Sequence, residues 1–412
     1  MKDTLIFEAS HDEMNTPVTM KMLSDKTLIS KSWQHNLTSQ ITGMTDVMTG
    51  ESTIYSYEDK RLKTSKQGAD ASLSYNYDEA GNMTEKAGIS FTRSTTSVVG
   101  SRNGTEVIAA DFDGVGRMCS RTAEGSKYEF KYDHHGKMAE MIEVTTGAKT
   151  VWIQNSEGSN ILRISPDGTE TVTVGNDFVS TKRRDESRKT KVRVFGSDRV
   201  LATVMLKQSS GSTDRTASVE VYCTDHKGSV THVYEGSTKN LTSLQYDDYG
   251  ARSGKVLRDK PDDDMDGLTY ESKRIEGRSG LLDFNGRWYD PLLGRFTTPD
   301  AVTDLDGLAN RDGMNRYAFE NNDPINHIDP SGHWSWNAIG GIIIGVALVA
   351  AAIVASVATA GIATPFLAAI AAGYVPLSYS MTLMFTDSFL QCGRRSHGRR
   401  YRGHNLFTEA QR

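Results

Sequence analysis

Apolar and polar residues alternate with a period of two along much of the chain. The alternation is plain in EFKY at residues 129–132 and in VRVF at residues 192–195. Such alternation is typical of β-strands that bury one face and expose the other. Glycine is frequent, with 37 among 412 residues, and proline is scarce, with 9, which favours short strands joined by tight turns. The pattern therefore predicts an all-β protein.

A short motif recurs between the expected strands. It consists of an aromatic residue, Asp, two variable residues, Gly, a polar residue and an apolar residue. Its clearest copies are YDEAGNM at 77–83, FDGVGRM at 112–118 and YDHHGKM at 132–138. Degenerate copies begin at Tyr57 and Trp152, and related later ones at Cys223 and Tyr246. Starts at 57 and 77, at 112 and 132, and at 132 and 152 each lie 20 residues apart. Regular spacing of this kind indicates a repeat architecture.

Each copy of the motif has the chemistry of a β-hairpin. The aromatic residue buries a large side chain on a strand, and Asp accepts bonds from nearby backbone N–H groups. Gly then supplies the positive φ that closes the turn. One unit is too small to bury its own face, so stability must come from stacking on neighbouring units. We therefore interpret the Asp residues of the motif as turn caps rather than as catalytic groups.

A second, non-repeated run follows between residues 280 and 332. It contains LLDFNGRWYDPLLGRF at 281–296, TPD at 298–300, NRYAFENNDPIN at 315–326 and IDPSG at 328–332. Asp-Pro pairs favour an extended residue followed by a turn, because the residue before Pro avoids the α region. Together with the glycines, they predict a chain of short strands and sharp reversals.

The motif resembles the YD repeats of RHS proteins, Tc-toxin C components and teneurins, and the second run resembles the RHS-repeat-associated core. The resemblance spans residues 54–332 and is weak between 161 and 220. It implies a β-strand shell around a hollow interior, closed by a plug through which a variable C-terminal cargo joins. A complete shell in these families is longer, so the resemblance implies the C-terminal part of one. The implied domains are a YD-repeat shell segment at 1–270, a core or plug at 271–333, and a variable region at 334–412.

In several members of these families the plug is also an aspartyl autoprotease that cuts the cargo free. Such a protease needs two carboxylates that share a proton, one to activate water and one to protonate the leaving amide. By position in the resembling motif, the candidates are Asp300 and Asp312, with Asp329 next to the expected cut. Pro299 stands where the family often has Arg, and His333 where it often has an apolar residue. The alternative is that all three Asp residues only cap turns.

The variable region changes abruptly in composition. Residues 334–386 contain no Asp, Glu, Lys or Arg, and the apolar stretch 338–363 exceeds the ~20 residues needed to cross a bilayer. We expect the apolar segment 338–386 to be helical. It could insert into a membrane, serve as a hydrophobic spacer inside the shell, or form a buried helix of a small domain. The basic tail at 391–404 suits a cationic membrane flank, a solvated terminus or, less well, a nucleic-acid contact.

Several other kinds of chemistry find little support in the sequence. With 47 Lys and Arg against 52 Asp and Glu, the net charge of −5 argues against chain-wide nucleic-acid binding. The three cysteines form no CxxC pair, and no phosphate-binding loop, serine-hydrolase elbow or HExxH motif occurs. Four acidic residues lie within 262–266 and could ligate calcium, although a solvated loop is favoured because no bidentate Glu follows. We therefore expect neither cofactor nor metal.

Two functions from different classes fit these observations. The first is a toxin-delivery shell that works with an upstream shell or Tc-type partner subunits and carries its own C-terminal segment as cargo. The second is a teneurin-like adhesion or structural module without proteolysis, and a degenerate RHS remnant is a third possibility. Both functions imply a secreted or membrane-associated protein. Because the start of this sequence shows no signal peptide, we expect export to use another route or an upstream part of the protein.

Overall fold

The structure is a computed structural model that describes residues 6–11, 17–23, 27–155, 158–195, 199–236, 238, 240–252, 267–300, 315–333 and 336–337. The chain divides into two compact units, Met1–Ala363 and Thr364–Arg412, and all described residues belong to the first. Asp312, the acidic run 262–266, the apolar segment 338–386 and the basic tail 391–404 lie outside the described residues. The helical character of the C-terminal segment therefore stays a prediction.

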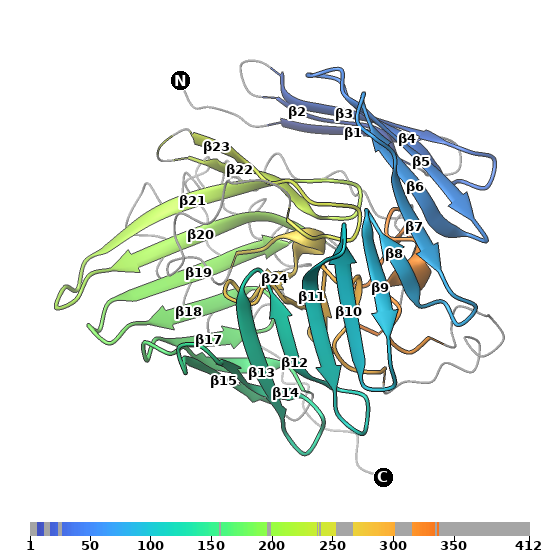
Figure 1. Ribbon diagram of the computed structural model, residues 1–412. Coiled ribbons are helices and arrows are strands. Elements are labelled where there is room, and N and C mark those ends of the chain that lie inside the picture. The colour runs from blue at the N-terminus through green and yellow to red at the C-terminus, as the bar shows by residue number, and fades with distance from the viewer. Residues whose placement is uncertain are drawn as a thin grey trace, which may run out of the picture. The chain divides into compact units, whose positions relative to one another are not determined.

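Within the described ranges, twenty-three strands form one antiparallel sheet, so the predicted all-β fold is confirmed (Figure 1). The first strands are β1 (Ile6–His11), β2 (Pro17–Leu23), β3 (Thr27–His35), β4 (Ile41–Asp46), β5 (Ser52–Glu58), β6 (Arg61–Gln67), β7 (Leu73–Tyr77), β8 (Met83–Lys86), β9 (Ile89–Arg93), β10 (Ser97–Arg102), β11 (Thr105–Phe112) and β12 (Met118–Ala123). They are followed by β13 (Ser126–Tyr132), β14 (Met138–Glu143), β15 (Lys149–Gln154), β16 (Asn160–Ile164), β17 (Glu170–Val174), β18 (Phe178–Lys182), β19 (Arg188–Phe195), β20 (Val200–Gln208), β21 (Arg215–Thr224), β22 (Val230–Glu235) and β23 (Asn240–Ser243). Each strand pairs with the next strand along the chain, as expected for stacked hairpins.

The turns between strands have the predicted chemistry. Asp113 Oδ1 accepts hydrogen bonds from the amides of Val115 at 3.1 Å and Arg117 at 2.8 Å. Gly116 closes that turn with φ +87°. The Asp residues at 133, 225 and 247 accept the amides two and four residues later in the same way. Their carboxylates are therefore turn caps, as interpreted from the sequence.

The tyrosines of the motif tie each hairpin to the one before it. The hydroxyl of Tyr132 donates to the carbonyl oxygen of Met118, 14 residues earlier, at 2.6 Å. Equivalent bonds run from Tyr57 to Ile41 at 2.6 Å, from Tyr77 to Leu62 at 3.0 Å and from Tyr246 to Val230 at 2.8 Å. Each acceptor lies at the start of the strand that follows the preceding turn. The repeat therefore stacks through hydrogen bonds as well as through apolar contacts.

The degenerate copy predicted to start at Trp152 has its turn two residues later. Gln154 takes the place of the tyrosine, and its side-chain amide donates to the Met138 carbonyl at 2.8 Å. Asn155 takes the place of Asp and accepts the amide of Ser159 at 2.9 Å. Trp152 instead packs on Trp288, with ring centroids 5.1 Å apart. The 20-residue spacing predicted the wrong start for this copy, because the position of its glycine determines the turn, and not the distance from the previous copy.

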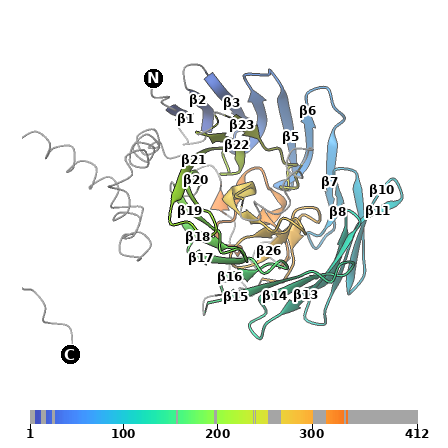
Figure 2. The ribbon, with the colours of Figure 1, turned by 90° about the vertical axis from the view of Figure 1, so that its left-hand side faces the viewer.

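The second run lies inside the ring formed by the strands (Figure 2). Together with its flanking residues, 267–279 and 333–337, it forms the short 3-10 helices η1 (Tyr270–Ser272) and η4 (Glu320–Asn322), a four-stranded sheet of β24 (Arg274–Ile275), β25 (Leu282–Asp283), β26 (Trp288–Asp290) and β27 (Arg295–Phe296), and the pair β28 (His327–Ile328) and β29 (Trp336–Asn337). Four of its aromatic residues, Phe284, Tyr289, Phe296 and Phe319, are fully buried and pack on one another. The run therefore supplies the centre of the hydrophobic core.

Buried polar contacts fasten the run to the surrounding sheet. Arg121 Nε on β12 lies 2.6 Å from Asp290 Oδ2, and both side chains are almost completely buried. The Tyr317 hydroxyl donates to the carbonyl of Gly116 at 2.7 Å. The Ile41 amide donates to Asn326 Oδ1 at 2.8 Å. These contacts fix the position of the run against the sheet.

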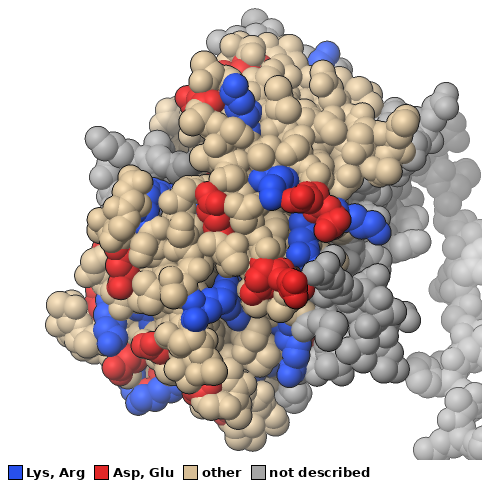
Figure 3. Space-filling model, turned by 45° about the vertical axis from the view of Figure 1, so that its right-hand side comes forward, with Lys and Arg blue, Asp and Glu red and all other residues tan. Residues whose placement is uncertain are grey.

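The outer surface is mixed in character. On the face shown in Figure 3, acidic and basic side chains are interspersed over a larger uncharged area. Within the described residues, no helix is long and apolar enough to cross a membrane.

Candidate functional site

Asp300 is held close to the turn at residues 329–333. Its carboxylate lies 3.0 Å from Arg287 Nη2 through Oδ2 and 2.9 Å from His333 Nδ1 through Oδ1. Its backbone is fixed by Arg316, since the Asp300 amide donates to the Arg316 carbonyl at 2.9 Å and Arg316 Nε donates back to the Asp300 carbonyl at 2.8 Å. The contact with Arg287 is buried, whereas the His333 side chain is 23% exposed, so that contact is only partly shielded from water.

Arg287 joins three segments of the run through one guanidinium. Besides Asp300, it donates through Nε to the carbonyl oxygen of Gly332 and through Nη1 to that of Arg316 at 3.0 Å. The guanidinium also lies 3.6 Å from the centre of the Phe296 ring. Burial lowers the pKa of Arg287 to about 10, and the neighbouring Asp300 partly opposes that shift. Arg287 thus holds the carbonyl one residue before His333 next to the Asp300 carboxylate.

Asp329 organises the turn itself. Its Oδ1 accepts the amides of Ser331 at 3.2 Å, Gly332 at 2.7 Å and His333 at 3.2 Å. Burial raises the pKa of Asp329, and the negative charge of Glu271 raises it further. These contacts are those of a turn cap, so Asp329 positions residues 331–333.

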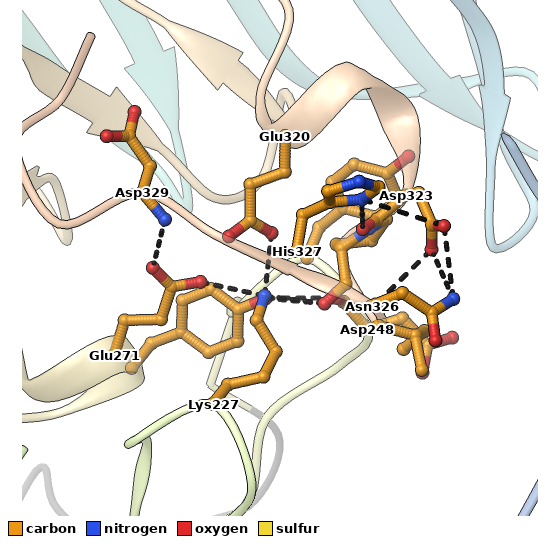
Figure 4. A network of polar contacts seen from close by, with 12 residues as sticks. Lys227, Asp248, Glu271, Glu320, Asp323, Asn326, His327 and Asp329 are labelled. Atoms are coloured by element: carbon orange, nitrogen blue, oxygen red, sulfur yellow. Dashed lines mark hydrogen bonds and ion pairs between the residues drawn. The ribbon is translucent and has the colours of Figure 1, made fainter. Parts of the chain in front are cut away.

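A buried ionic network contacts the same turn through Glu271 (Figure 4). Lys227 Nζ lies 2.7 Å from Glu271 Oε1 and 2.6 Å from Glu320 Oε2. Glu271 Oε2 in turn accepts the backbone amide of Asp329 at 3.0 Å. Burial alone would lower the pKa of Lys227, but the two carboxylates raise it. Burial raises the pKa of Glu320, and Glu271 adds to that effect.

The structure brings together two of the three predicted site residues. Asp300 and Asp329 both contact the turn, whereas Asp312 lies outside the described residues. The role of Arg287 was not predicted from the sequence, and His333 stood out there only as a departure from the family pattern. The sequence feature that could have indicated Arg287 is its position directly after the turn at Gly286, in a segment that is not part of the repeats. Nothing local to His333 indicated that its ring would contact Asp300.

Comparison with known sequences gives partial matches. Residues 214–325 match the family model described as Teneurin YD-shell. The tRNA3(Ser)-specific nuclease WapA of Bacillus spizizenii is 32% identical over 111 residues, and the tRNA nuclease WapA of Bacillus subtilis is 30% identical over 111 residues. Each match covers 26% of this chain and 4% of the relative, so the chain corresponds to a small part of these proteins.

Comparison with solved structures covers most of the chain. The crystal structure of TcdB2-TccC3 matches with a TM-score of 0.60 and 14% identity, over 80% of this chain and 19% of that one. The Photorhabdus luminescens Tc holotoxin pore matches with a TM-score of 0.61 and 15% identity, over 82% of this chain and 19% of that one. At such identities the likeness concerns the fold, which the turn-by-turn YD geometry supports independently. The chain therefore matches a teneurin YD-shell model over residues 214–325, and its fold resembles that of Tc toxin components.

Proposed function

We propose that the chain is a shell segment of a toxin-delivery protein, which encloses a C-terminal polypeptide and releases it by cutting itself next to His333. The cargo would be residues 334–412. Tc-type subunits or further shell sequence would complete the enclosure, and the assembly would act outside the producing cell. The toxin-type solved structures that share the fold support this proposal.

The observation that carries the proposal is the contact between Asp300 and His333. A buried carboxylate lies 2.9 Å from the side chain that directly precedes the variable region. Arg287 holds the neighbouring Gly332 carbonyl, and Asp329 holds three successive amides of the turn. Peptide hydrolysis needs the scissile segment fixed beside a carboxylate, and this geometry provides such a fixed segment.

The proposed reaction uses Asp300 and Asp312 as a pair. The Arg287 guanidinium favours the ionised form of Asp300, so the proton that the pair shares would start on Asp312. The ionised Asp300 then accepts a proton from water. The water oxygen then bonds to the His333 carbonyl carbon. As the bond to the Trp334 nitrogen breaks, Asp312 donates the proton that the leaving amine needs. Asp329 acts as a positioning residue, because its contacts hold the backbone of the turn.

The test is the fate of the purified full-length protein. We expect a denaturing gel and intact-mass measurement to show two fragments that separate after His333. Asp300→Asn and Asp312→Asn should each leave one full-length species. Asp70→Asn is the matched control, because Asp70 is an exposed residue, and it should cut like the wild type. A wild-type protein that stays intact on prolonged incubation would contradict the proposed cleavage.

A structural or adhesive module without proteolysis is the second candidate. It is favoured by the match to a teneurin shell model and by the cap geometry of Asp329. On this hypothesis the Asp300 contacts serve stability alone. A persistently intact chain whose Asp300→Asn variant unfolds at lower denaturant would support it.

A further inference from the structure

The chain contains two Asn-Gly pairs, at 103–104 and 285–286, and they lie in contrasting surroundings. In such a pair the glycine nitrogen is unhindered and can attack the side-chain carbonyl carbon of the preceding Asn, which releases ammonia. In a folded protein this reaction has two requirements. The glycine amide must be free of hydrogen bonds, and the backbone must be able to rotate until the two atoms meet.

The first pair forms the tip of the hairpin between β10 and β11. Asn103 and Gly104 are the two residues between these strands, and their φ angles of +52° and +78° are those of a type I′ turn. Both residues are exposed. Within the described ranges, neither the Asn103 side chain nor the Gly104 amide makes a hydrogen bond. A β-carbon built on Gly104 would meet no atom within 4 Å beyond its chain neighbours, so this side of the tip is open.

The second pair lies in the second run, and its backbone is fixed. The Gly286 amide donates to the carbonyl oxygens of Phe284 at 2.9 Å and Ser331 at 3.1 Å. The Gly286 carbonyl oxygen accepts a hydrogen bond from Lys137 Nζ at 2.6 Å. Asn285 itself is half-buried. The peptide bond between Asn285 and Gly286 therefore cannot turn without breaking the hydrogen bonds of the Gly286 amide.

We propose that Asn103 is a site of spontaneous deamidation in the folded protein, and that Asn285 is protected from this reaction. Exposed loop tips open locally at little cost in free energy. Opening this tip disturbs only the outermost pair of the hairpin, Arg102 with Thr105. The inference does not depend on the proposed cleavage, because it involves neither the carboxylates at 300 and 312 nor the C-terminal segment.

The only other reactant is water. Hydroxide removes the proton of the Gly104 amide, and the nitrogen bonds to Asn103 Cγ. The bond between Cγ and Nδ2 then breaks, and Nδ2 leaves as ammonia with a proton from water, which restores the hydroxide. Water next opens the resulting cyclic imide at either of its carbonyl carbons. The product is Asp or isoaspartate, and either one adds a negative charge to the tip. Isoaspartate also lengthens the main chain, so it should disrupt a turn whose length sets the strand register.

Peptide mapping of the full-length protein, incubated in mildly alkaline buffer, measures both sites in one sample. We expect Asn103 to convert to Asp and isoaspartate at least about tenfold faster than Asn285, because breaking the hydrogen bonds of Gly286 adds to the barrier there. In guanidinium chloride this difference should largely disappear, because unfolding removes the protection of Asn285. Asn103→Gln is the control for the assignment, and it should abolish conversion at that position, because Gln would have to close a larger ring.

The folded sample is incubated for as long as the unfolded sample needs to convert. If Asn103 stays intact in the folded protein over that time, the turn protects it and the proposal is overturned. Equal rates at the two sites in the folded protein would refute the protection assigned to the Gly286 hydrogen bonds. Both peptides precede His333 in the sequence, so their conversion can be measured whether or not the chain cuts itself.

Discussion

Replacing Asp290 by Asn tests whether the second run, called the inner run below because it lies inside the ring of strands, holds the sheet together. The Asp290 side chain is completely buried and lies 2.6 Å from Arg121 Nε on β12, whose own side chain is 3% exposed. The other carboxylate oxygen accepts the amides of Leu292 at 3.0 Å and Leu293 at 3.3 Å. Asn keeps the shape and can still accept those amides through Oδ1. The substitution therefore removes mainly the charge opposite Arg121.

The expected cost follows from the burial of the pair. Removing one partner of a buried ion pair leaves the other charge uncompensated and costs about 3–5 kcal/mol. A typical domain unfolds with a free energy of about 5–15 kcal/mol, so Asp290→Asn should consume a large part of the stability. Adding Arg121→Gln should recover part of the loss, because no buried charge then remains unpaired.

Urea unfolding followed by tryptophan fluorescence measures this effect. The matched control is Arg117→Gln, which breaks the pair between Arg117 and Asp113. Those side chains are 30% and 26% exposed, and a solvated pair contributes less than about 1 kcal/mol. If Asp290→Asn shifts the midpoint no more than Arg117→Gln does, the inner run does not anchor the sheet. A recovery in the double variant would confirm that the uncompensated Arg121 charge causes the loss.

Three further substitutions test other parts of the fold. Gly116→Ala should lower the melting temperature more than Gly104→Ala: both glycines have positive φ, but only at Gly116 would the added carbon meet a tyrosine hydroxyl. Equal shifts would contradict the close approach. Tyr132→Phe removes the 2.6 Å bond to the Met118 carbonyl and should cost about 1–2 kcal/mol in urea unfolding, whereas no loss would show that the bond does not stabilise stacking. Glu320→Gln should flatten the pH dependence of the melting temperature. Burial raises the Glu320 pKa in the folded state, so that state holds the proton more tightly and stability falls as the pH rises above 4.5. An unchanged slope in the variant would contradict this reasoning.

The repeats could be predicted from the sequence because their chemistry is local. Asp113 and Asp133 bond amides no more than four residues away, and Gly116 closes its own turn. A motif whose contacts are all local predicts a hairpin wherever it occurs in the sequence. The all-β fold and the structural role of these Asp residues followed from that and are confirmed.

The site and the inward-facing side of some strands could not be predicted in this way. Lys227 pairs with Glu320, 93 residues further on, and alone it resembles any surface lysine. The contact between Asp300 and His333 crosses 33 residues, including a stretch outside the described ranges. In β17, Thr and Val alternate, and alternation alone does not tell which face is inside. The structure places Thr171 inside, against the usual preference for burying valine.

The pairing of every strand with its chain neighbour has a consequence for biosynthesis. Hairpins that pair only with the previous hairpin can be added one at a time while the ribosome is still translating. Their partners inside the ring of strands are synthesised much later. Asp290 follows Arg121 by 169 residues in the sequence, and Asn326 follows Ile41 by 285. A nascent chain that stops before residue 267 should therefore display the apolar inner side of its strands and attract chaperones. Synthesis of residues 267–333 would end that exposure.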